Sequence, residues 1–417
     1  MTRNRLLIGD ALASARALPS ESVHCIVTSP PYWGLRSYLA DDDPAKAAEM
    51  GAEPTLSEYV ERMVALFREL RRVLRRDGVC WLNLGDCYAG TGKPGGGAQG
   101  ARAEQCRATA ANGKGTWEPP RSSGLKPKDL CLVPYRVAMA LQADGWYLRS
   151  HIIWHKPNPM PESVTDRPTS AHEAVFLLTR EPRYWYDADA IREASAHADR
   201  AKDTPGTRAG QPSSAVNGRR DSSGGVGYSE GGRNKRNVWT IATRPYSGSH
   251  YAVMPPALVE PCILAGCPAK ACAECGAGWV RVVEKGESSW EARRAAGHKS
   301  DRGGNSKIQL SHGASHDFDN TAGGFGTPAK RATLGFRPSC DCDAGTVPGV
   351  TLDPFMGSGT VAMVAEQLGR DWIGFDLDAR NAALVVERVK ARTVEAALEK
   401  TEPGALPGQR GLFGATA

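Results

Sequence analysis

Hydrophobic and polar positions along the chain follow two periods, one typical of buried strands and one of amphipathic helices. Short apolar runs predict strands, at residues 5–8, 23–27, 79–84, 147–154, 174–178, 238–241, 350–352 and 372–375. Helical spacing predicts helices, at residues 11–18, 55–76, 134–143, 361–368 and 379–392. The longest helix opens with a capping-box pair, Thr55 and Glu58. Alternating strands and helices predict an α/β fold with a mostly parallel sheet and an antiparallel hairpin at one edge.

Composition narrows the class of protein. The chain has 417 residues, of which 41% are hydrophobic and 24% charged, so we expect a packed core. The net charge of +6 is compatible with a polyanionic partner. We find no apolar run long enough to span a bilayer and no signal-peptide pattern, so we expect a soluble, cytoplasmic protein. Eleven cysteines in a chain of this size do not suggest a disulfide scaffold.

Residues 28–33, Thr-Ser-Pro-Pro-Tyr-Trp, follow the predicted strand 23–27. Pro30 and Pro31 end the strand because neither offers an N–H. The Ser29 hydroxyl, the Pro30 carbonyl and the Tyr32 ring therefore gather at a carboxyl edge, where open α/β sheets bind ligands. A flat heterocycle bearing an amino group suits this corner, since the ring can stack on it and the two oxygens can accept its hydrogens. A strand that simply ends in a Pro-Pro turn fits equally well.

Residues 353–360, Asp-Pro-Phe-Met-Gly-Ser-Gly-Thr, form a second candidate site. Gly357 and Gly359 allow a sharp bend close to a ligand, and a helix from Thr360 presents free N–H groups to a negative group. Asp376 ends the next strand, where acids grip ribose hydroxyls in nucleotide folds. No Lys-Ser or Lys-Thr pair follows, which excludes a phosphate-binding P-loop. We favour a nucleoside-type cofactor over a merely tight strand–helix connection.

Together the two motifs resemble those of the site-specific DNA amino-methyltransferases, which methylate N4 of cytosine or N6 of adenine with S-adenosylmethionine. Residues 28–33 resemble the catalytic motif, and residues 353–360, with Asp353 and Phe355, resemble the cofactor loop. The catalytic motif comes first, an order similar to that of the beta group. The resemblance implies a Rossmann-like S-adenosylmethionine-dependent methyltransferase fold with helices on both sheet faces and inserted DNA-recognition loops.

The resemblance also implies the reaction. Hydrogen bonds from an exocyclic amine to Ser29 and the Pro30 carbonyl would favour a pyramidal nitrogen whose lone pair faces the methyl group. The target base must first leave the duplex stack, with Tyr32 as the stacking platform. In this family a serine at position 29 leans towards N4 of cytosine, with N6 of adenine as the alternative.

Four more residues receive roles through the resemblance. Asp10 is similar to the segment that holds the adenine of the cofactor, and His250 begins a stretch that resembles the segment over its methionine moiety. Lys156 and Asn158 lie in a Pro-rich turn that would flank the target base, where Lys156 would contact phosphate and Asn158 base or phosphate. A Pro-stiffened hairpin turn explains these two residues at least as well.

These interpretations divide the chain into ranges. We expect a catalytic half at 1–190 with a mobile basic loop at 90–128, a flexible target-recognition region at 191–236, a cofactor-side segment at 237–264, a cysteine-rich zinc-binding insertion at 265–345, a cofactor-binding half at 346–400 and a disordered tail at 401–417.

The cysteine-rich range suggests a metal. Cys272 and Cys275 form a knuckle closed by a glycine, and Cys340 and Cys342 offer a second pair, so that four thiolates would make a closed tetrahedral zinc site. Cys267 is an alternative ligand. We favour structural zinc over free cysteines and over catalytic zinc, because methyl transfer needs no open metal position.

Two rival functions remain at this point. One is methylation of a protein amide or an RNA base, and the other is a non-catalytic zinc protein that binds DNA. The expected partner is double-stranded DNA. The target sequence, a cognate restriction enzyme and the oligomeric state are left open.

Overall fold

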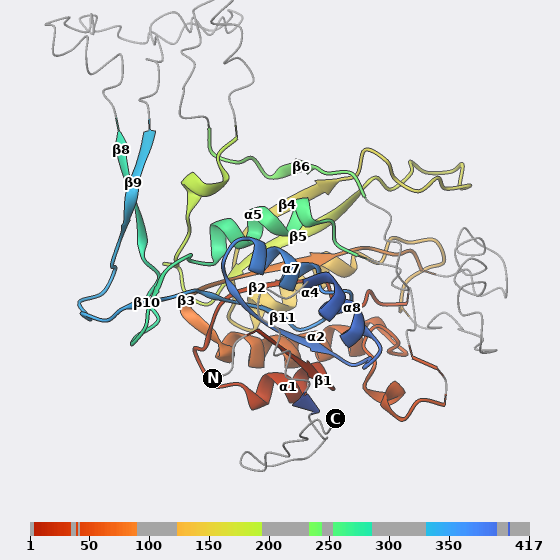
Figure 1. The fold of residues 1–417 in the computed structure, drawn as a ribbon. Helices are drawn as coiled ribbons and strands as arrows, with labels where there is room; N and C mark the ends of the chain where they lie inside the picture. Colours follow the sequence, from red (N-terminus) through yellow and green to blue (C-terminus); the bar gives the residue numbers. More distant parts are fainter. Residues whose placement is uncertain are drawn as a thin grey trace, which may run out of the picture. The chain divides into compact units, whose positions relative to one another are not determined.

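A central sheet carries both candidate motifs in this computed structural model, which describes residues 4–34, 39–40, 42–89, 123–193, 233–243, 253–285, 331–389 and 399–400. Its strands are β1 (Arg5–Ile8), β2 (Val23–Thr28), β3 (Leu74–Leu84), β4 (Tyr147–His155), β5 (His172–Thr179), β6 (Val238–Thr240), β11 (Val350–Asp353), β12 (Asp371–Asp376) and β13 (Glu399–Lys400). Within the described residues their order is β13-β1-β12-β11-β2-β3-β5-β4-β6. Figure 1 labels most of these strands, except β12 and β13.

The sheet is mostly parallel, as predicted. Neighbouring strands from β13 to β3 run parallel, β5 is antiparallel to β3 and to β4, and β6 returns parallel to β4. The antiparallel hairpin β4–β5 is confirmed, although β6 and not the hairpin forms the outer edge. β1 and β2 are parallel but not neighbours, because β12 and β11 lie between them.

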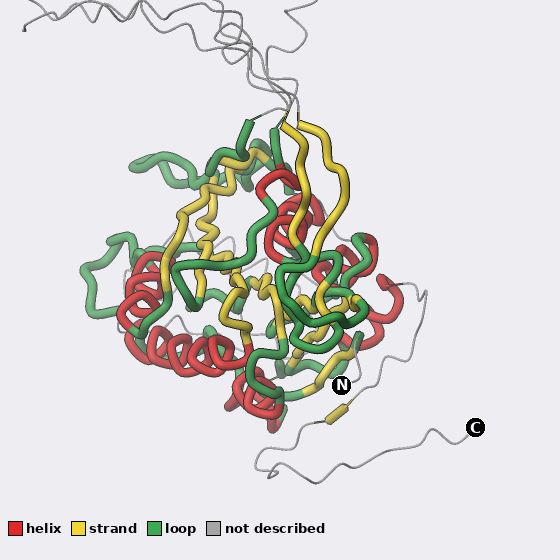
Figure 2. The backbone as a smooth tube through the Cα atoms, turned by 90° about the vertical axis from the view of Figure 1, so that its left-hand side faces the viewer, coloured by secondary structure: helices red, strands yellow, loops and turns green. Residues whose placement is uncertain are grey.

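Helices cover both faces of the sheet (Figure 2). They are α1 (Ala11–Ala17), α2 (Leu56–Val73), α4 (Val133–Ala143), α5 (Pro256–Gly266), α7 (Thr360–Gln367) and α8 (Asn381–Val389). α2 contacts α1 and α4, whereas α7 contacts α5 and α8. Cys80 and Leu82 of β3 join the core with α2, while Val79 and Trp81 point to the opposite face, against Gly266 of α5. Both faces of the sheet are thus packed against helices, which is the Rossmann-like α/β fold that was predicted.

The end of α2 differs from the expectation. The capping box of Thr55 and Glu58 is present, but the helix ends at Val73 and β3 begins at Leu74, so Arg75 and Arg76 lie in a strand. Arg75 pairs with Asp77 at 2.9 Å. The expectation of a helix to residue 76 was wrong because Leu74 pairs with Val23 of β2 and Arg76 pairs with Glu21, so this stretch joins the sheet.

Contacts divide the chain into two units. The first comprises residues 1–190, 236–279 and 338–417, and the second comprises 191–235 and 280–337. The second unit thus draws on both ranges that were expected to be insertions. It contains an antiparallel pair, β8 (Val280–Lys285) and β9 (Arg331–Arg337), in which Arg281 lies over the Phe336 ring. Residues 90–122, 194–232 and 401–417, which cover most of the expected basic loop, target-recognition region and tail, lie outside the described residues. Within the described part, no helix combines the length and apolar character needed to cross a membrane.

Candidate active site

The two sequence motifs end neighbouring parallel strands. β2 pairs with β11 through Ile26 and Leu352, and the next residues form the two motifs. The Thr28 hydroxyl donates a hydrogen bond of 2.9 Å to Asp353 Oδ1, and both side chains are buried. Both motifs therefore lie at the same edge of the sheet, the carboxyl edge.

Asp353 holds the start of the Gly-rich turn. Its Oδ1 also accepts the Phe355 N–H at 3.0 Å. Burial raises the pKa of the Asp353 carboxyl to about 7, although the Phe355 N–H and the Thr28 hydroxyl act in the opposite direction. A cation bound at this edge would favour the ionised carboxylate and so offset the free-energy cost of burying its charge.

The turn itself needs its glycines. Gly357 and Gly359 have φ angles of 52° and 82°, in the left-handed region that favours glycine. A Cβ on Gly359 would also lie 3.1 Å from Val385 Cα of α8. Gly359 precedes α7, whose first turn starts at Thr360 with N–H groups at the carboxyl edge.

Asp376 closes the turn from the neighbouring strand. Its Oδ2 accepts the Gly357 N–H at 2.7 Å, and its Oδ1 accepts from the Asp378 N–H and the Asn381 amide. Because a carboxylate offers about four acceptor positions, room remains for one further hydrogen bond. Burial raises the pKa of Asp376 to about 6.

One residue at the turn was missed by sequence reasoning. Arg388, from α8, donates to Ser358 Oγ at 2.6 Å and to Thr360 Oγ1 at 3.0 Å. It lies 28 positions beyond Thr360 in the chain, and no local pattern links the two. Its guanidinium holds the hydroxyls of the turn in place.

Asp10 lies at the same edge. β1 runs beside β12 with Ile8 opposite Asp376, and the Gly9 N–H donates to the Asp376 carbonyl at 2.8 Å. Asp10 Oδ1 caps α1 by accepting the Ala13 N–H at 2.8 Å. His250, the other residue assigned by resemblance to the cofactor, lies outside the described residues.

The Pro-Pro segment is tied to α2. The Tyr59 hydroxyl donates to the Pro31 carbonyl at 3.0 Å, and the Trp33 indole donates to the Glu53 carbonyl at 3.0 Å. Trp33 is buried in the core, whereas Ser29 and Tyr32 are partly exposed. Ser29 and Tyr32 are therefore the polar side chains of this motif that can meet a ligand.

Tyr32 is held at its hydroxyl and along one edge of its ring. Its hydroxyl lies 2.7 Å from Glu173 Oε2, 3.0 Å from Asn83 Oδ1 and 3.1 Å from Ser29 Oγ. Its ring edge lies against Gly85, where an added Cβ would come within 2.5 Å of Cε2. Glu173, Asn83 and Gly85 were not predicted from the sequence.

Lys156 and Asn158 both have partners within the chain. Lys156 forms an ion pair with Glu173 and lies over the Trp154 ring, 4.5 Å from its centroid. The Asn158 amide donates to the Thr243 carbonyl at 3.1 Å and accepts its N–H at 3.0 Å. These contacts give both residues a structural role.

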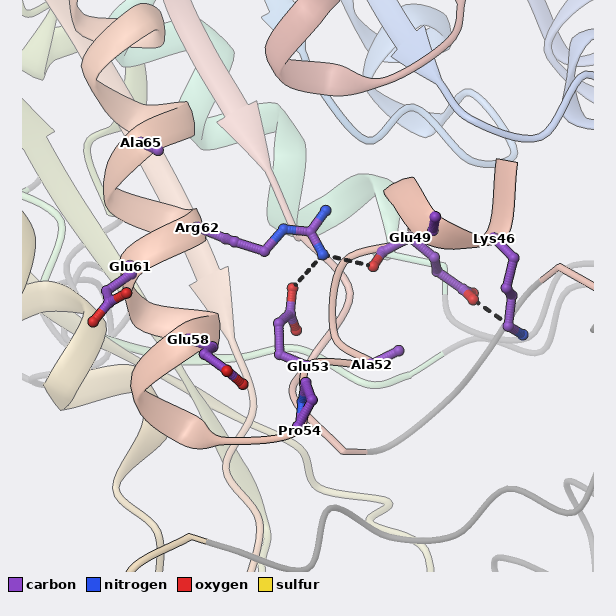
Figure 3. Close-up of a pocket in the computed structure, with 10 residues that line it drawn as sticks. Lys46, Glu49, Ala52, Glu53, Pro54, Glu58, Glu61, Arg62 and Ala65 are labelled. Carbon is purple, nitrogen blue, oxygen red and sulfur yellow. Dashed lines mark hydrogen bonds and ion pairs between the residues drawn. The ribbon is translucent and has the colours of Figure 1, made fainter. Parts of the chain in front are cut away.

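The loop after the catalytic motif packs on α2 around a surface cavity of about 580 Å³ (Figure 3). Arg62 of α2 donates to Glu53 Oε1 at 2.9 Å and to the Glu49 carbonyl at 3.0 Å. Glu53 Oε2 accepts the Gly51 N–H at 2.8 Å, and burial raises the pKa of Glu53 above its ordinary value. Four glutamates outnumber the two basic residues in the walls, so this cavity does not suit DNA phosphate, and the contacts instead hold the loop.

The four predicted metal ligands come together. The sulfur atoms of Cys272, Cys275, Cys340 and Cys342 all lie within 4.8 Å of one another. The Cys275 N–H lowers the pKa of the Cys272 thiol to about 7, whereas hydrogen bonds with neighbouring thiols of the cluster raise the pKa values of Cys340 and Cys342. Cys267 lies in the core, and burial raises its pKa to about 12. The cluster therefore has four ligands without it.

The cysteine cluster is joined directly to the sheet of the first unit. Arg75 donates to the Cys275 carbonyl at 2.8 Å. His24 Nδ1 accepts the Val350 N–H at 3.0 Å, so its Nε2 carries the hydrogen that bonds the Gly276 carbonyl at 2.9 Å. The knuckle thus rests on β2, β3 and β11, the strands that end in the candidate site.

A family model for DNA methylases matches residues 23–271 and 346–387 of this chain. The chain belongs to the N6/N4 DNA methylase family. It is 33% identical to the type II methyltransferase M.SmaI of Serratia marcescens over 389 residues, which cover 93% of this chain and 91% of the relative. It is 43% identical to M.Cfr9I of Citrobacter freundii over 264 residues, which cover 62% and 71%. Among solved structures, the PvuII cytosine-N4-specific DNA methyltransferase aligns with a TM-score of 0.48 at 14% identity, covering 95% of this chain and 89% of that one.

Family membership makes the protein an S-adenosylmethionine-dependent DNA amino-methyltransferase that acts on N4 of cytosine or N6 of adenine. The residues at the carboxyl edge fit this cofactor. Gly357 and Gly359 keep the turn open to close approach, and Asp376 has acceptor capacity left for a hydroxyl. Burial disfavours the charges of Asp353 and Asp376, and a sulfonium cation nearby would favour them.

Proposed function

We propose that the protein methylates the exocyclic N4 amine of cytosine in double-stranded DNA. The observation that carries the proposal is the position of Ser29, a neutral hydroxyl acceptor one residue after Thr28, whose side chain bonds Asp353 of the cofactor turn. The resemblance of the serine form of the motif to cytosine-specific enzymes supports this choice of base. N6 of adenine is the alternative, because an adenine amine could use the same corner.

In the proposed mechanism the chain mainly positions its reactants. Bound S-adenosylmethionine would supply a methyl group that is already activated by the sulfonium: its C–S bond would break as the bond to the amine nitrogen forms, and one amine proton would be lost to solvent. Ser29 Oγ and the Pro30 carbonyl accept the two amine hydrogens, which turns the nitrogen lone pair towards the methyl group. Tyr32 stacks on the extruded base. The cofactor is held by residues of the Gly-rich turn and of the elements around it, namely Asp353, Phe355, Gly357, Gly359, Thr360, Asp376, Asp10 and His250.

DNA contacts form a second part of the proposal. Lys156 lies beside the catalytic Tyr32 through their shared partner Glu173, which supports a place for it at the rim of the base pocket. Asn158 fixes the neighbouring turn to Thr243 and would meet the strand beside the extruded base. The type II names of the relatives support a role in a restriction–modification system with a cognate restriction enzyme and a cytoplasmic location.

We also propose that the four-cysteine cluster binds structural zinc. The convergence of four sulfur atoms supports it, since tetrahedral thiolate sites of this kind are closed and hold a fold together. Zinc would fix the segments around residues 272 and 340 at the amino edge of the catalytic sheet. Elemental analysis should find about one zinc per chain, and fully active protein without zinc would refute this part.

Mass spectrometry of nucleosides tests the main proposal. DNA incubated with enzyme and methyl-labelled cofactor should contain label in N4-methylcytosine. Label in N6-methyladenine would support the alternative, and label only in RNA or protein would reject DNA as the substrate. The variant Ser29→Ala is the matched control, and unchanged methylation by this variant would remove Ser29 from the mechanism.

A further inference from the structure

The Tyr32 hydroxyl has more acceptors around it than hydrogens to give. Its oxygen lies 2.7 Å from Glu173 Oε2 and 3.0 Å from Asn83 Oδ1. A phenol donates a single hydrogen. A carboxylate is the stronger acceptor and is also the nearer one here. The Tyr32 hydrogen therefore points to Glu173.

Neighbouring side chains hold Glu173 in this position. Its other oxygen, Oε1, is paired with the Lys156 ammonium. The Asn83 amide donates to Glu173 Oε2 at 3.1 Å and to the Ala174 carbonyl at 3.2 Å. With its NH₂ group used in this way, Asn83 turns only its oxygen to Tyr32 and offers it no hydrogen.

The direction of these bonds decides the role of the serine. Ser29 Oγ lies 3.1 Å from the Tyr32 oxygen, and one of the two must donate. Because the Tyr32 hydrogen is used by Glu173, the Ser29 hydroxyl donates to Tyr32. The lone pairs of Ser29 Oγ are then turned away from Tyr32 and are open to an incoming N–H.

A serine needs such orientation, whereas a carboxylate does not. An aspartate at position 29 would be an acceptor in every rotamer. A serine hydroxyl that rotated its hydrogen towards the substrate would meet the amine hydrogens with a donor and repel them. The proton of Ser29 must therefore be directed elsewhere for the amine to bind.

We propose that Glu173, acting through the Tyr32 hydroxyl, is a positioning residue that fixes Ser29 as the hydrogen-bond acceptor for the amino group of the target base. This inference rests on the proposed function of Ser29. It adds a chain of three residues, Glu173, Tyr32 and Ser29, drawn from β5 and the loop after β2.

A double-mutant cycle tests the inference in the full-length enzyme, using single-turnover transfer of labelled methyl to DNA. Tyr32→Phe keeps the stacking ring and removes the hydroxyl, and it should lower the transfer rate by roughly 10-fold with little change in KM for DNA. In the Ser29→Ala background the same change should cost less than about 2-fold, because no serine proton remains to be oriented. Equal losses in both backgrounds would overturn the inference.

Tyr59→Phe is the matched control. It also removes a tyrosine hydroxyl that holds this segment, through the Pro31 carbonyl, but it has no path to the Ser29 proton. Its loss should therefore be the same in the wild-type and Ser29→Ala backgrounds. Glu173→Gln should reproduce the Tyr32→Phe loss, since its amide can donate to the Tyr32 oxygen and reverse the bond.

A second background keeps the test decisive if Ser29→Ala is too slow to measure. In Ser29→Asp the carboxylate accepts without orientation, so Tyr32→Phe should cost less there than in the wild type. An undiminished cost in Ser29→Asp would contradict the inference. Failure of the proposed function looks different, because wild-type enzyme would then place no label on cytosine, whatever the Tyr32 variants do.

Discussion

The variant Asp353→Asn measures how much stability the protein loses by burying the ionised carboxylate that joins the two motifs. Burial raises the pKa of Asp353 from 3.8 to about 7 in the folded protein. Between these values the folded state binds a proton that the unfolded state has lost, so stability falls as the pH rises through this window. The whole gap corresponds to about 4 kcal/mol at 1.36 kcal/mol per pKa unit.

Asparagine is neutral at every pH and keeps an oxygen for the Thr28 hydroxyl and the Phe355 N–H. The stability of Asp353→Asn relative to the wild type should therefore increase by about 2–3 kcal/mol between about pH 5 and pH 8. Urea unfolding of the cofactor-free protein at both pH values measures this change. The comparison across pH removes any constant effect of the new NH₂ group.

Thr28→Val provides a control of opposite sign. Removing the hydroxyl takes a hydrogen bond from the ionised carboxylate, so this variant should lose more stability at the higher pH than at the lower one. If Asp353→Asn differed from the wild type by the same amount at both pH values, Asp353 would titrate alike in the folded and unfolded chain. The argument from burial would then be refuted.

Three further substitutions test other parts of the structure. Gly85→Ala should lower kcat by at least about 10-fold, because its Cβ would come within 2.5 Å of the Tyr32 ring and displace it. Arg62→Met should lower the free energy of unfolding by about 2 kcal/mol, since it leaves the buried Glu53 carboxylate without its cation. Cys275→Ser should lower both the zinc content and Tm, and a strong chelator should lower Tm of the wild type in the same way.

Each of these has a control within the chain. Gly345→Ala adds a methyl group in open space and should leave kcat unchanged. Arg76→Met removes an ion pair with the exposed Glu21 and should cost less than about 1 kcal/mol. Cys80→Ala should keep the zinc, because Cys80 lies in the core away from the cluster. Equal effects of test and control in any pair would contradict the corresponding assignment.

Local signals predicted the parts of the site that lie within one stretch of chain. The glycines at 357 and 359, the strand ends at Thr28 and Asp353, and the knuckle at Cys272 each depend on backbone or ligand requirements that leave a mark in the sequence. Parallel strands place their carboxyl ends at one edge, so the position of both motifs at that edge followed from the strand–helix pattern, whereas the pairing of β2 with β11 did not.

Contacts between residues that are distant in sequence could not be predicted from local patterns. Glu173 meets Tyr32 across 141 positions, and Arg75 meets the Cys275 carbonyl across 200 positions. Local sequence also did not predict that β12 and β11, from the far end of the chain, lie between β1 and β2. Strand order and side-chain partners depend on tertiary packing, which local periodicity does not encode.

A crystal structure with S-adenosylhomocysteine and a duplex containing the target site tests the central claim most directly. The account predicts an extruded cytosine whose N4 lies within hydrogen-bonding distance of Ser29 Oγ and the Pro30 carbonyl, with its ring stacked on Tyr32 and the cofactor sulfur on the opposite side of N4. A base seated elsewhere, or an amine bound to neither oxygen, would contradict it.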